Sequence, residues 1–454
     1  MENTGNFTVD FINDNIDGTT TVYYDFNWVK NTSEEYNHKL AKMVSQFAML
    51  GYDKGFEDET KSTGYDYTKP NLKIALENCG FKNIEINATA TRDEVNYFIA
   101  QRPTEVEGKK YNLVFAAFIG SYTKQWYSNF DPFGTERITN DGYGYAGFEE
   151  KGKVHLGFAD AREYVYDKLI KYIKRNPDDG ELKLLLTGHS RGAAVANLLA
   201  AKLIVQGKLG DIEIDKDNIF TYCYATPNGV ILSEEEKNNP DFKRIFSIVN
   251  PEDFVTEVLP EAWGFGKYGT VYTLPSKSNN KILSFEAYEK VMQDYYKRFK
   301  LGKEYHPFKK GTDAVDKISE IFAMGMENLE SYYTKEMKEL FDDKTPFDYF
   351  MTTLCPYVAC GTSDEDIAAK NECAKLLLLS AYDFVGTDAA YRNISRFFVQ
   401  KEGFGGITNN RVSSTYFSDS HRPETYCAYM MAVSKEAFLN EPEPEDTQTE
   451  ETSE

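Results

Sequence analysis

Residues 188–192 read Gly-His-Ser-Arg-Gly, a stretch that combines a potential nucleophile with the backbone geometry that would expose it. A largely apolar run at 184–187 precedes it, and an alanine-rich run at 193–196 follows. A serine hydroxyl is a weak nucleophile unless it is exposed, aligned and close to a base. A tight strand-to-helix turn between glycines exposes the serine and points the next backbone N–H toward the developing oxyanion. The pattern predicts a nucleophile, Ser190, and the alternative is a glycine-rich turn that binds nothing or an anion.

The serine needs a base. The chain has five histidines: His38, His155, His189, His306 and His421. In α/β-hydrolases the serine, the acid and the histidine follow one another in this order, so the two histidines that precede the serine are excluded. The third is the serine's neighbour, and adjacent side chains on such a turn diverge. Of the remaining two we favour His421, because it lies just before the final apolar helix, whereas His306 lies in a charged connection.

The acid must orient the imidazole and stabilise its charged form. A strand is predicted at 244–250, and sites of α/β proteins assemble at the carboxyl ends of such strands. Asp253 follows this strand after a three-residue turn that contains Pro251. We favour Asp253, because the proline restricts the turn and the apolar pair after the aspartate can anchor it. Glu252 and Asp241 are the alternatives.

Strands and helices alternate around the serine. Strands are predicted at 94–101, 111–119, 182–187, 218–225 and 244–250, and helices at 159–175 and 191–206. The apolar run at 113–119 is continuous, as in a strand that is buried on both faces. This alternation predicts an α/β fold with a mostly parallel central sheet and right-handed crossovers.

The first hundred residues carry more local signals. Alternating runs at 7–12 and 19–26 predict two strands joined by a polar turn. A capping box at residues 32–35 predicts the start of a helix that Gly51 ends. A second helix is predicted at 70–79, with proline in its first turn.

The chain is predicted to divide into four parts. We expect residues 1–262 to form the first part of the core. Residues 263–405 have helical periodicity, apart from a short strand near 271–274, and predict a large helical insertion, or cap, between the acid and the base. Residues 406–440 return to the core with the histidine, and the acidic residues 441–454 predict a disordered tail.

Composition excludes several classes of protein. The 51 basic and 72 acidic residues give a net charge of −21, which repels phosphate backbones, so no nucleic-acid partner is expected. No apolar run approaches the roughly 18 residues that a membrane-spanning helix needs. The first residues lack the segments of a signal peptide, which predicts a cytoplasmic protein, or a secreted one if a signal was removed. The six cysteines fit no common zinc spacing, and we expect no metal, cofactor or protein partner.

Several blocks of the sequence together resemble the class 3 lipases, a branch of the α/β-hydrolases. The resemblance covers about residues 100–265 and 410–435. Its blocks are 118–121, 154–158, 187–199, 224–227, 250–255 and His421 with Tyr426. It implies an α/β-hydrolase fold, with Ser190 as nucleophile, Asp253 as acid and His421 as base. It also implies an oxyanion hole formed by Ser121 and the backbone of Arg191.

Residues 121–150 are rich in aromatic side chains interleaved with glycines. Such a loop is typical of a lid or an acyl-chain surface, with Trp126, Tyr127 and Phe130 as candidate contacts. The alternative is a tyrosine-rich loop packed on the body of the protein.

The activity expected from these residues is that of a serine carboxylester hydrolase, a lipase or esterase. It would cleave lipid or acyl esters through an acyl-enzyme, with transient contact to a lipid surface. Two alternatives remain on the same fold. One is a catalytically idle lipid-binding or scaffold protein, and the other is acyl transfer or peptide hydrolysis by the same triad.

Overall fold

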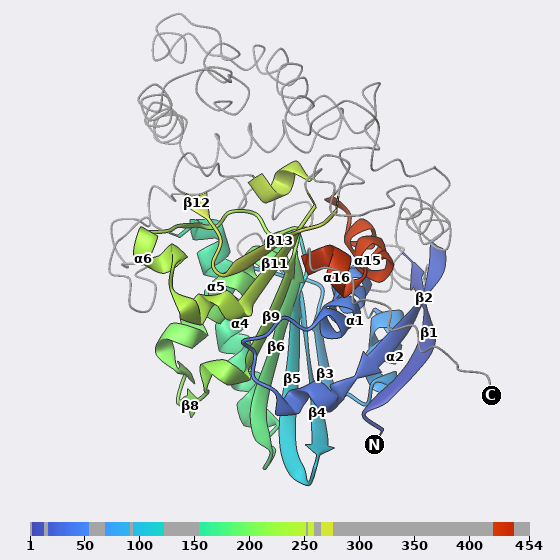
Figure 1. Ribbon diagram of the computed structural model, residues 1–454. Coiled ribbons are helices and arrows are strands. Elements are labelled where there is room, and N and C mark those ends of the chain that lie inside the picture. The colour runs from blue at the N-terminus through green and yellow to red at the C-terminus, as the bar shows by residue number, and fades with distance from the viewer. Residues whose placement is uncertain are drawn as a thin grey trace, which may run out of the picture.

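The structure is a computed structural model, and Figure 1 shows its arrangement. It describes residues 2–12, 17–53, 69–90, 94–121, 154–250, 253–257, 265–275 and 421–439. The aromatic segment at 122–150, the predicted insertion from 276 to 405 and the acidic tail lie outside the described residues.

A seven-stranded sheet forms the centre of the molecule. Its strands are, in spatial order, β13 (Thr270–Thr273), β11 (Ile245–Val249), β9 (Ile219–Tyr224), β6 (Glu181–His189), β5 (Lys109–Phe118), β4 (Tyr97–Val106) and β3 (Lys82–Asn87). The first five are parallel, and β4 runs antiparallel to both of its neighbours. The predicted α/β-hydrolase-like fold with a mostly parallel sheet is therefore confirmed.

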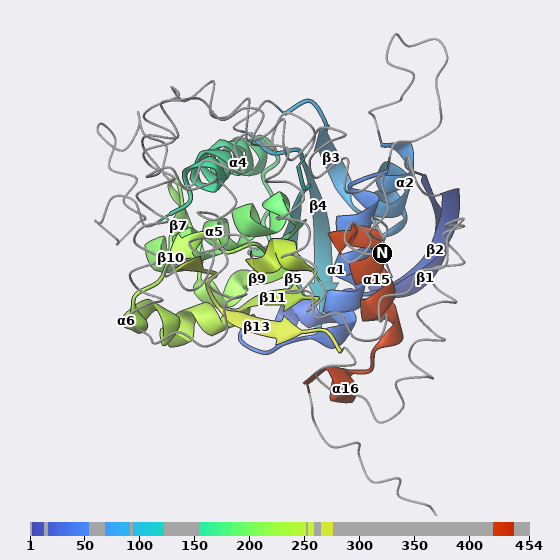
Figure 2. The ribbon, with the colours of Figure 1, turned by 90° about the horizontal axis from the view of Figure 1, so that it is seen from above.

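Helices cover both faces of the sheet (Figure 2). On one face lie α4 (Leu156–Arg175) and α5 (Arg191–Gln206), and on the other lie α1 (His38–Leu50), α2 (Pro70–Asn78) and α15 (Pro423–Ala432). In β5, Leu113 and Phe115 join the core of the second face, whereas Val114 and Ala116 join that of the first. Successive side chains of a strand point to opposite faces, so two buried faces require a continuous apolar run.

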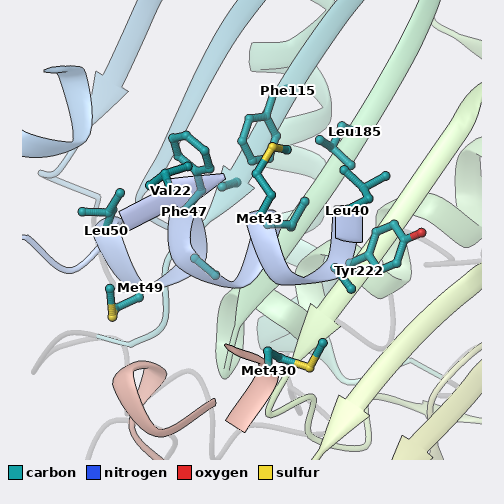
Figure 3. Packing of buried hydrophobic residues seen from close by; sticks show 14 of the residues in the cluster. Val22, Leu40, Met43, Phe47, Met49, Leu50, Phe115, Leu185, Tyr222 and Met430 are labelled. Carbon is teal, nitrogen blue, oxygen red and sulfur yellow. The ribbon is translucent and has the colours of Figure 1, made fainter. Parts of the chain in front are cut away.

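Helix α1 packs between the sheet and α15. Met43 and Phe47 lie beside Phe115 of β5, and Met430 of α15 lies on the other side of the helix (Figure 3). The helix begins later than its predicted capping box at 32–35. Its N-cap is Asn37, whose side chain accepts a hydrogen bond from the backbone N–H of Leu40 at 3.1 Å.

Tertiary contacts explain why the predicted capping box does not start α1. Tyr36 packs its ring on Phe246 and Tyr272, and the Ser33 N–H donates to the carbonyl of Asp217. These contacts hold residues 33–36 on the sheet in a non-helical conformation. The predicted ends of the two N-terminal helices are confirmed, since Gly51 caps α1 and Cys79 caps α2.

The remaining elements are short or lie at the edges. The predicted N-terminal strands are confirmed as the antiparallel pair β1 (Thr4–Ile12) and β2 (Asp17–Asp25). The others are η1 (Phe26–Lys30), β7 (Lys208–Leu209), β8 (Ile212–Glu213), η2 (Lys216–Asn218), β10 (Val230–Ile231), α6 (Glu234–Lys237), η3 (Pro240–Arg244), η4 (Phe254–Glu257), β12 (Phe265–Gly266) and α16 (Lys435–Leu439).

The edge strand β13 corrects the predicted core boundary at residue 262. The sequence assigned the short strand near 271–274 to the insertion, but β13 runs parallel to β11 in the central sheet. The N–H of Leu274 also donates to the carbonyl of Val249 at 2.8 Å. The first part of the core therefore extends to Leu274. The physical reason is that β13 pairs with backbone groups that β11 would otherwise expose at the edge of the sheet.

Two absences can be stated for the described residues. In these ranges no helix has the length and apolar character to cross a membrane. The same ranges contain no group of three histidine, cysteine or acidic side chains placed to hold a metal ion.

The first residue of α1, His38, fastens the end of α15. Its Nε2–H donates to the carbonyl of Val433 at 3.0 Å, and its Nδ1 accepts from the Tyr36 hydroxyl at 3.0 Å. Burial lowers the pKa of His38 from 6.5 to about 4, and the charges of Lys42, Lys435 and Glu436 alter it less.

This lowered pKa predicts a loss of stability in acid. Between pH 6.5 and 4 the unfolded chain binds a proton at His38 that the folded chain does not, so the free energy of unfolding falls as the pH falls through this window. The two and a half pKa units correspond to about 3 kcal/mol. Urea unfolding at pH 7 and pH 4.5 measures it, with His38→Gln, which retains a donor for Val433, as the control. An equal loss in both proteins would contradict the prediction.

Candidate active site

Ser190 occupies a strained turn between β6 and α5. Its backbone has φ 58° and ψ −128°, in the half of conformational space that residues with a side chain seldom adopt. Its N–H donates to the carbonyl of Tyr224 at 3.0 Å, which fastens it to β9. Its own carbonyl accepts from the N–H groups of Ala193 and Ala194 in the first turn of α5. The neighbouring strand and helix thus hold the turn in this conformation.

The two glycines that flank the serine are needed for close approach. A Cβ on Gly188 would lie 2.2 Å from the carbonyl carbon of Gly192, where strand and helix pass each other. A Cβ on Gly192 would lie 2.0 Å from the carbonyl oxygen of Phe118, at the end of β5. Gly188 therefore lets strand and helix pass each other, whereas Gly192 makes room for the neighbouring strand.

The side chains of Ser190, His421 and Asp253 form a continuous hydrogen-bonded row. His421 Nε2 lies 2.9 Å from Ser190 Oγ, and His421 Nδ1 lies 2.8 Å from Asp253 Oδ2. A carboxylate only accepts, so the proton of a neutral His421 is assigned to Nδ1, which leaves Nε2 to accept the serine proton. Ser190 and Asp253 are buried, while the side chain of His421 is 18% exposed.

Asp253 accepts hydrogen bonds from three donors, of which the first is Nδ1–H of His421. The hydroxyl of Tyr426 donates to Asp253 Oδ2 at 2.7 Å, beside the His421 ring, and the N–H of Val255 donates to Oδ1 at 3.0 Å. The same Tyr426 hydroxyl accepts from the N–H of Asn250 at the end of β11. These donors orient the carboxylate toward the His421 ring, where it can stabilise a protonated imidazole.

Sequence reasoning assigned no role to Tyr426. The available signal was its position in α15, about one turn after the helix begins, which places it close to His421.

The other candidate acids and bases have other roles or lie elsewhere. Asp241 forms an ion pair with Lys216 at 2.5 Å. His155 caps α4, where its Nδ1 accepts from the Phe158 N–H at 3.4 Å and its ring stacks on Phe158. Glu252 and His306 lie outside the described residues.

His189, next to the serine, points both ring nitrogens away from it. Its Nδ1 lies 2.8 Å from the Tyr52 hydroxyl, and its Nε2 lies 2.7 Å from the backbone carbonyl of His421. Burial, with a smaller effect of His421, lowers the pKa of His189 well below its ordinary value. His189 is therefore neutral, and this arrangement agrees with its exclusion as the base of Ser190.

The candidate oxyanion residues follow two neighbouring strands of the sheet, β5 and β6. Ser121 follows Gly120, where an added Cβ would lie 3.0 Å from Ser190 Cβ and 2.0 Å from the Tyr52 hydroxyl oxygen. Arg191 is the first residue of α5, so its backbone N–H belongs to the positive end of the helix.

The guanidinium of Arg191 is directed elsewhere. It donates to the carbonyl of Gly157 at 2.8 Å and to that of Glu94 at 3.3 Å, and it lies over the ring of Phe158. The backbone of Arg191, and not its side chain, is therefore the part that borders Ser190. The predicted lid contacts Trp126, Tyr127 and Phe130 lie outside the described residues.

Comparison with known proteins identifies one family. Residues 115–263 match the family described as lipase (class 3). No curated protein matches the chain.

Three solved structures are similar to this chain. A fungal lipase in complex with an inhibitor has 25% identity over 44% of this chain and 71% of its own, with a TM-score of 0.32. Rhizomucor miehei lipase with its propeptide has 23% identity over 44% and 60%, with a TM-score of 0.31. A mono- and diacylglycerol lipase from Aspergillus oryzae has 21% identity over 54% and 82%, with a TM-score of 0.37.

The matched segment contains both the strained turn at Ser190 and the carboxylate of Asp253. Residues 115–263 of this chain are therefore similar to the class 3 lipases.

Proposed function

We propose that this protein is a serine carboxylester hydrolase that cleaves lipid or acyl esters through an acyl-enzyme. The observation that carries the proposal is the 2.9 Å contact between Ser190 Oγ and His421 Nε2, with the far side of the ring on Asp253. A serine activated by an oriented base is the arrangement that acyl transfer requires. The match of residues 115–263 to the lipase (class 3) family supports an ester as substrate.

The proposed reaction has two halves. Ser190 Oγ attacks the ester carbonyl carbon while His421 Nε2 takes its proton. The tetrahedral oxyanion is stabilised by Ser121 and the N–H of Arg191, and Asp253 stabilises the imidazolium. His421 returns the proton to the leaving alcohol as the acyl-enzyme forms. Water then attacks the acyl carbonyl carbon with His421 as base, which releases the acid and restores Ser190.

The insertion is proposed to act as a cap over this site. The described chain leaves the sheet after β13 and returns at His421, so the residues between them begin at the edge of the sheet and end at the base. A segment with these two ends, together with the aromatic residues Trp126, Tyr127 and Phe130, would restrict the size of the acyl group.

Ester turnover with a serine variant tests the proposal. Wild-type protein should hydrolyse p-nitrophenyl butyrate and octanoate and should react with a fluorophosphonate probe, whereas Ser190→Ala should lose on the order of 10⁵ in kcat. Equal turnover by the two proteins would refute the proposal. No labelling of the wild type would support the idle scaffold, and acyl transfer to an added alcohol or amine in preference to water would support a transferase.

The oxyanion assignment makes a separate prediction. Ser121→Ala should lower kcat by about 10²–10³, because a preorganised donor to the oxyanion is worth roughly 3–4 kcal/mol in the transition state. KM should change much less, since the ground-state carbonyl carries little of this charge. Steady-state kinetics on the two p-nitrophenyl esters measure both constants. An unchanged kcat would remove Ser121 from this role.

A further inference from the structure

Two consecutive residues of the turn, His189 and Ser190, contact the same partner, His421. Ser190 meets the His421 ring, and His189 meets the His421 backbone carbonyl at 2.7 Å. A carbonyl only accepts, so His189 Nε2 must carry a proton. The neutral ring then accepts at Nδ1, and the Tyr52 hydroxyl at 2.8 Å is the donor. The Tyr52 hydroxyl thus supplies the partner of Nδ1 and holds the His189 ring with Nε2 toward His421.

A similar pair holds the other end of α15. Tyr36 donates to His38 Nδ1, and His38 Nε2–H donates to the carbonyl of Val433, the C-cap of α15. Both pairs originate at α1, since His38 is its first residue and Tyr52 follows its end. The start of α1 is therefore linked to the end of α15, and the end of α1, through His189, to the start of α15. These links, start to end and end to start, show that the two helices lie antiparallel.

We infer that His189 and Tyr52 are positioning residues that set the place of the His421 imidazole between Ser190 and Asp253. This inference rests on the proposed function. His421 follows a long segment of the chain, so its place depends on how its own backbone docks. The bond to His189 fixes that backbone to the residue next to the nucleophile. Small displacements of reacting groups can cost about 10² in rate.

The chemistry of the site favours a histidine as this donor. His421 becomes positively charged each time it takes the serine proton, so a cation beside its carbonyl would oppose the step. A buried imidazole remains neutral and still supplies an N–H. Gly120 leaves space for the Tyr52 hydroxyl, since a Cβ there would lie 2.0 Å from that oxygen.

Two substitutions of His189 separate its bonds. In His189→Gln the amide nitrogen takes the place of Nε2 and can still donate to His421. In His189→Asn the side chain reaches only the place of Nδ1, so it keeps a partner for Tyr52 and loses the bond to His421. We expect His189→Asn to lower kcat for p-nitrophenyl butyrate by about 10² with KM within about twofold, and His189→Gln to lose less than about tenfold.

The third variant, Tyr52→Phe, removes only the hydroxyl. It should lower kcat by about tenfold, because the buried Nδ1 of His189 then loses the hydrogen bond that holds the ring in place. It also serves if His189→Asn does not fold, which circular dichroism would reveal. Equal kcat values for the His189→Asn, His189→Gln and wild-type proteins would overturn the inference, and so would a change in KM alone. If His189→Asn does not fold, a wild-type kcat in Tyr52→Phe would overturn it.

A readout independent of turnover separates this inference from the proposed function. The His421 Nδ1–H, bonded to Asp253, should give a downfield proton resonance in NMR that is absent from His421→Gln. The resonance should shift or broaden in His189→Asn and remain in His189→Gln. If it behaves so while the wild type hydrolyses no ester, the proposed function fails and the positioning stands. If wild type is active and the resonance is the same in all His189 variants, the positioning fails.

Discussion

Replacing His421 by glutamine should lower kcat for p-nitrophenyl esters by about 10⁵ and slow fluorophosphonate labelling of Ser190 correspondingly. The amide can occupy the place of the ring and donate to Ser190 Oγ, but it cannot take the serine proton. In triads of this kind, loss of the base costs about as much as loss of the nucleophile. Ester turnover and the rate of labelling, measured on protein with a wild-type circular dichroism spectrum, test the expectation.

The matched control is the competing histidine, His306. His306→Gln should retain wild-type kcat, because the contact to Ser190 Oγ comes from His421 Nε2 at 2.9 Å. His155→Gln, in a residue that caps α4, controls for the loss of a buried imidazole. A loss of 10⁵ in His306→Gln, with activity preserved in His421→Gln, would reverse the assignment of the base.

The second large effect is expected at the acid. Asp253→Asn should lower kcat by about 10⁴, because an amide nitrogen facing Nδ1 would stabilise the tautomer whose Nε2 already carries a proton. The amide also offers no charge to the imidazolium. The Val255 N–H donates to Oδ1, so the amide oxygen is drawn to that position and the amide nitrogen takes the place of Oδ2, 2.8 Å from His421 Nδ1. The measurement is the pH dependence of kcat/KM, together with kcat at the optimum.

The two competing carboxylates are the controls for the acid. Asp241 is engaged with Lys216, so Asp241→Asn should leave kcat within about twofold and affect at most a weak exposed ion pair. Glu252→Gln, one residue before the proposed acid, should also retain activity. If either control loses more than Asp253→Asn does, the acid is misassigned.

Much of the sheet was predictable because its signals are local. The continuous apolar run in β5 and the small residues of α5 depend on burial of both faces of the sheet, which each segment records in its own composition. Strand β3, by contrast, was not predicted. Its residues Lys82–Asn87 are exposed or half-buried, only Ile84 and Ile86 are apolar, and the segment becomes a strand by pairing with β4.

The errors had the same origin. The capping box at 32–35 is a correct local pattern, but contacts of Tyr36 with Phe246 and Tyr272 hold that segment out of the helix. The strand β13 looked like part of an insertion, since four residues, three half-buried and one exposed, carry little signal. The strand belongs to the central sheet because it pairs with β11. This pairing leaves no pattern in the residues of β13 themselves.

By itself, the sequence determined the turn at Ser190 and the residues eligible to serve it. Glycines at 188 and 192, an apolar strand and a small-residue helix are local requirements, and five histidines leave few choices of base. Only the tertiary structure decided how His421 is held. Tyr52, His189 and Tyr426 come from three separate segments, and their hydrogen bonds form only when α1, β6 and α15 pack together. A side chain's hydrogen-bonding partner across such distances in the chain is a property of packing, which no local pattern records.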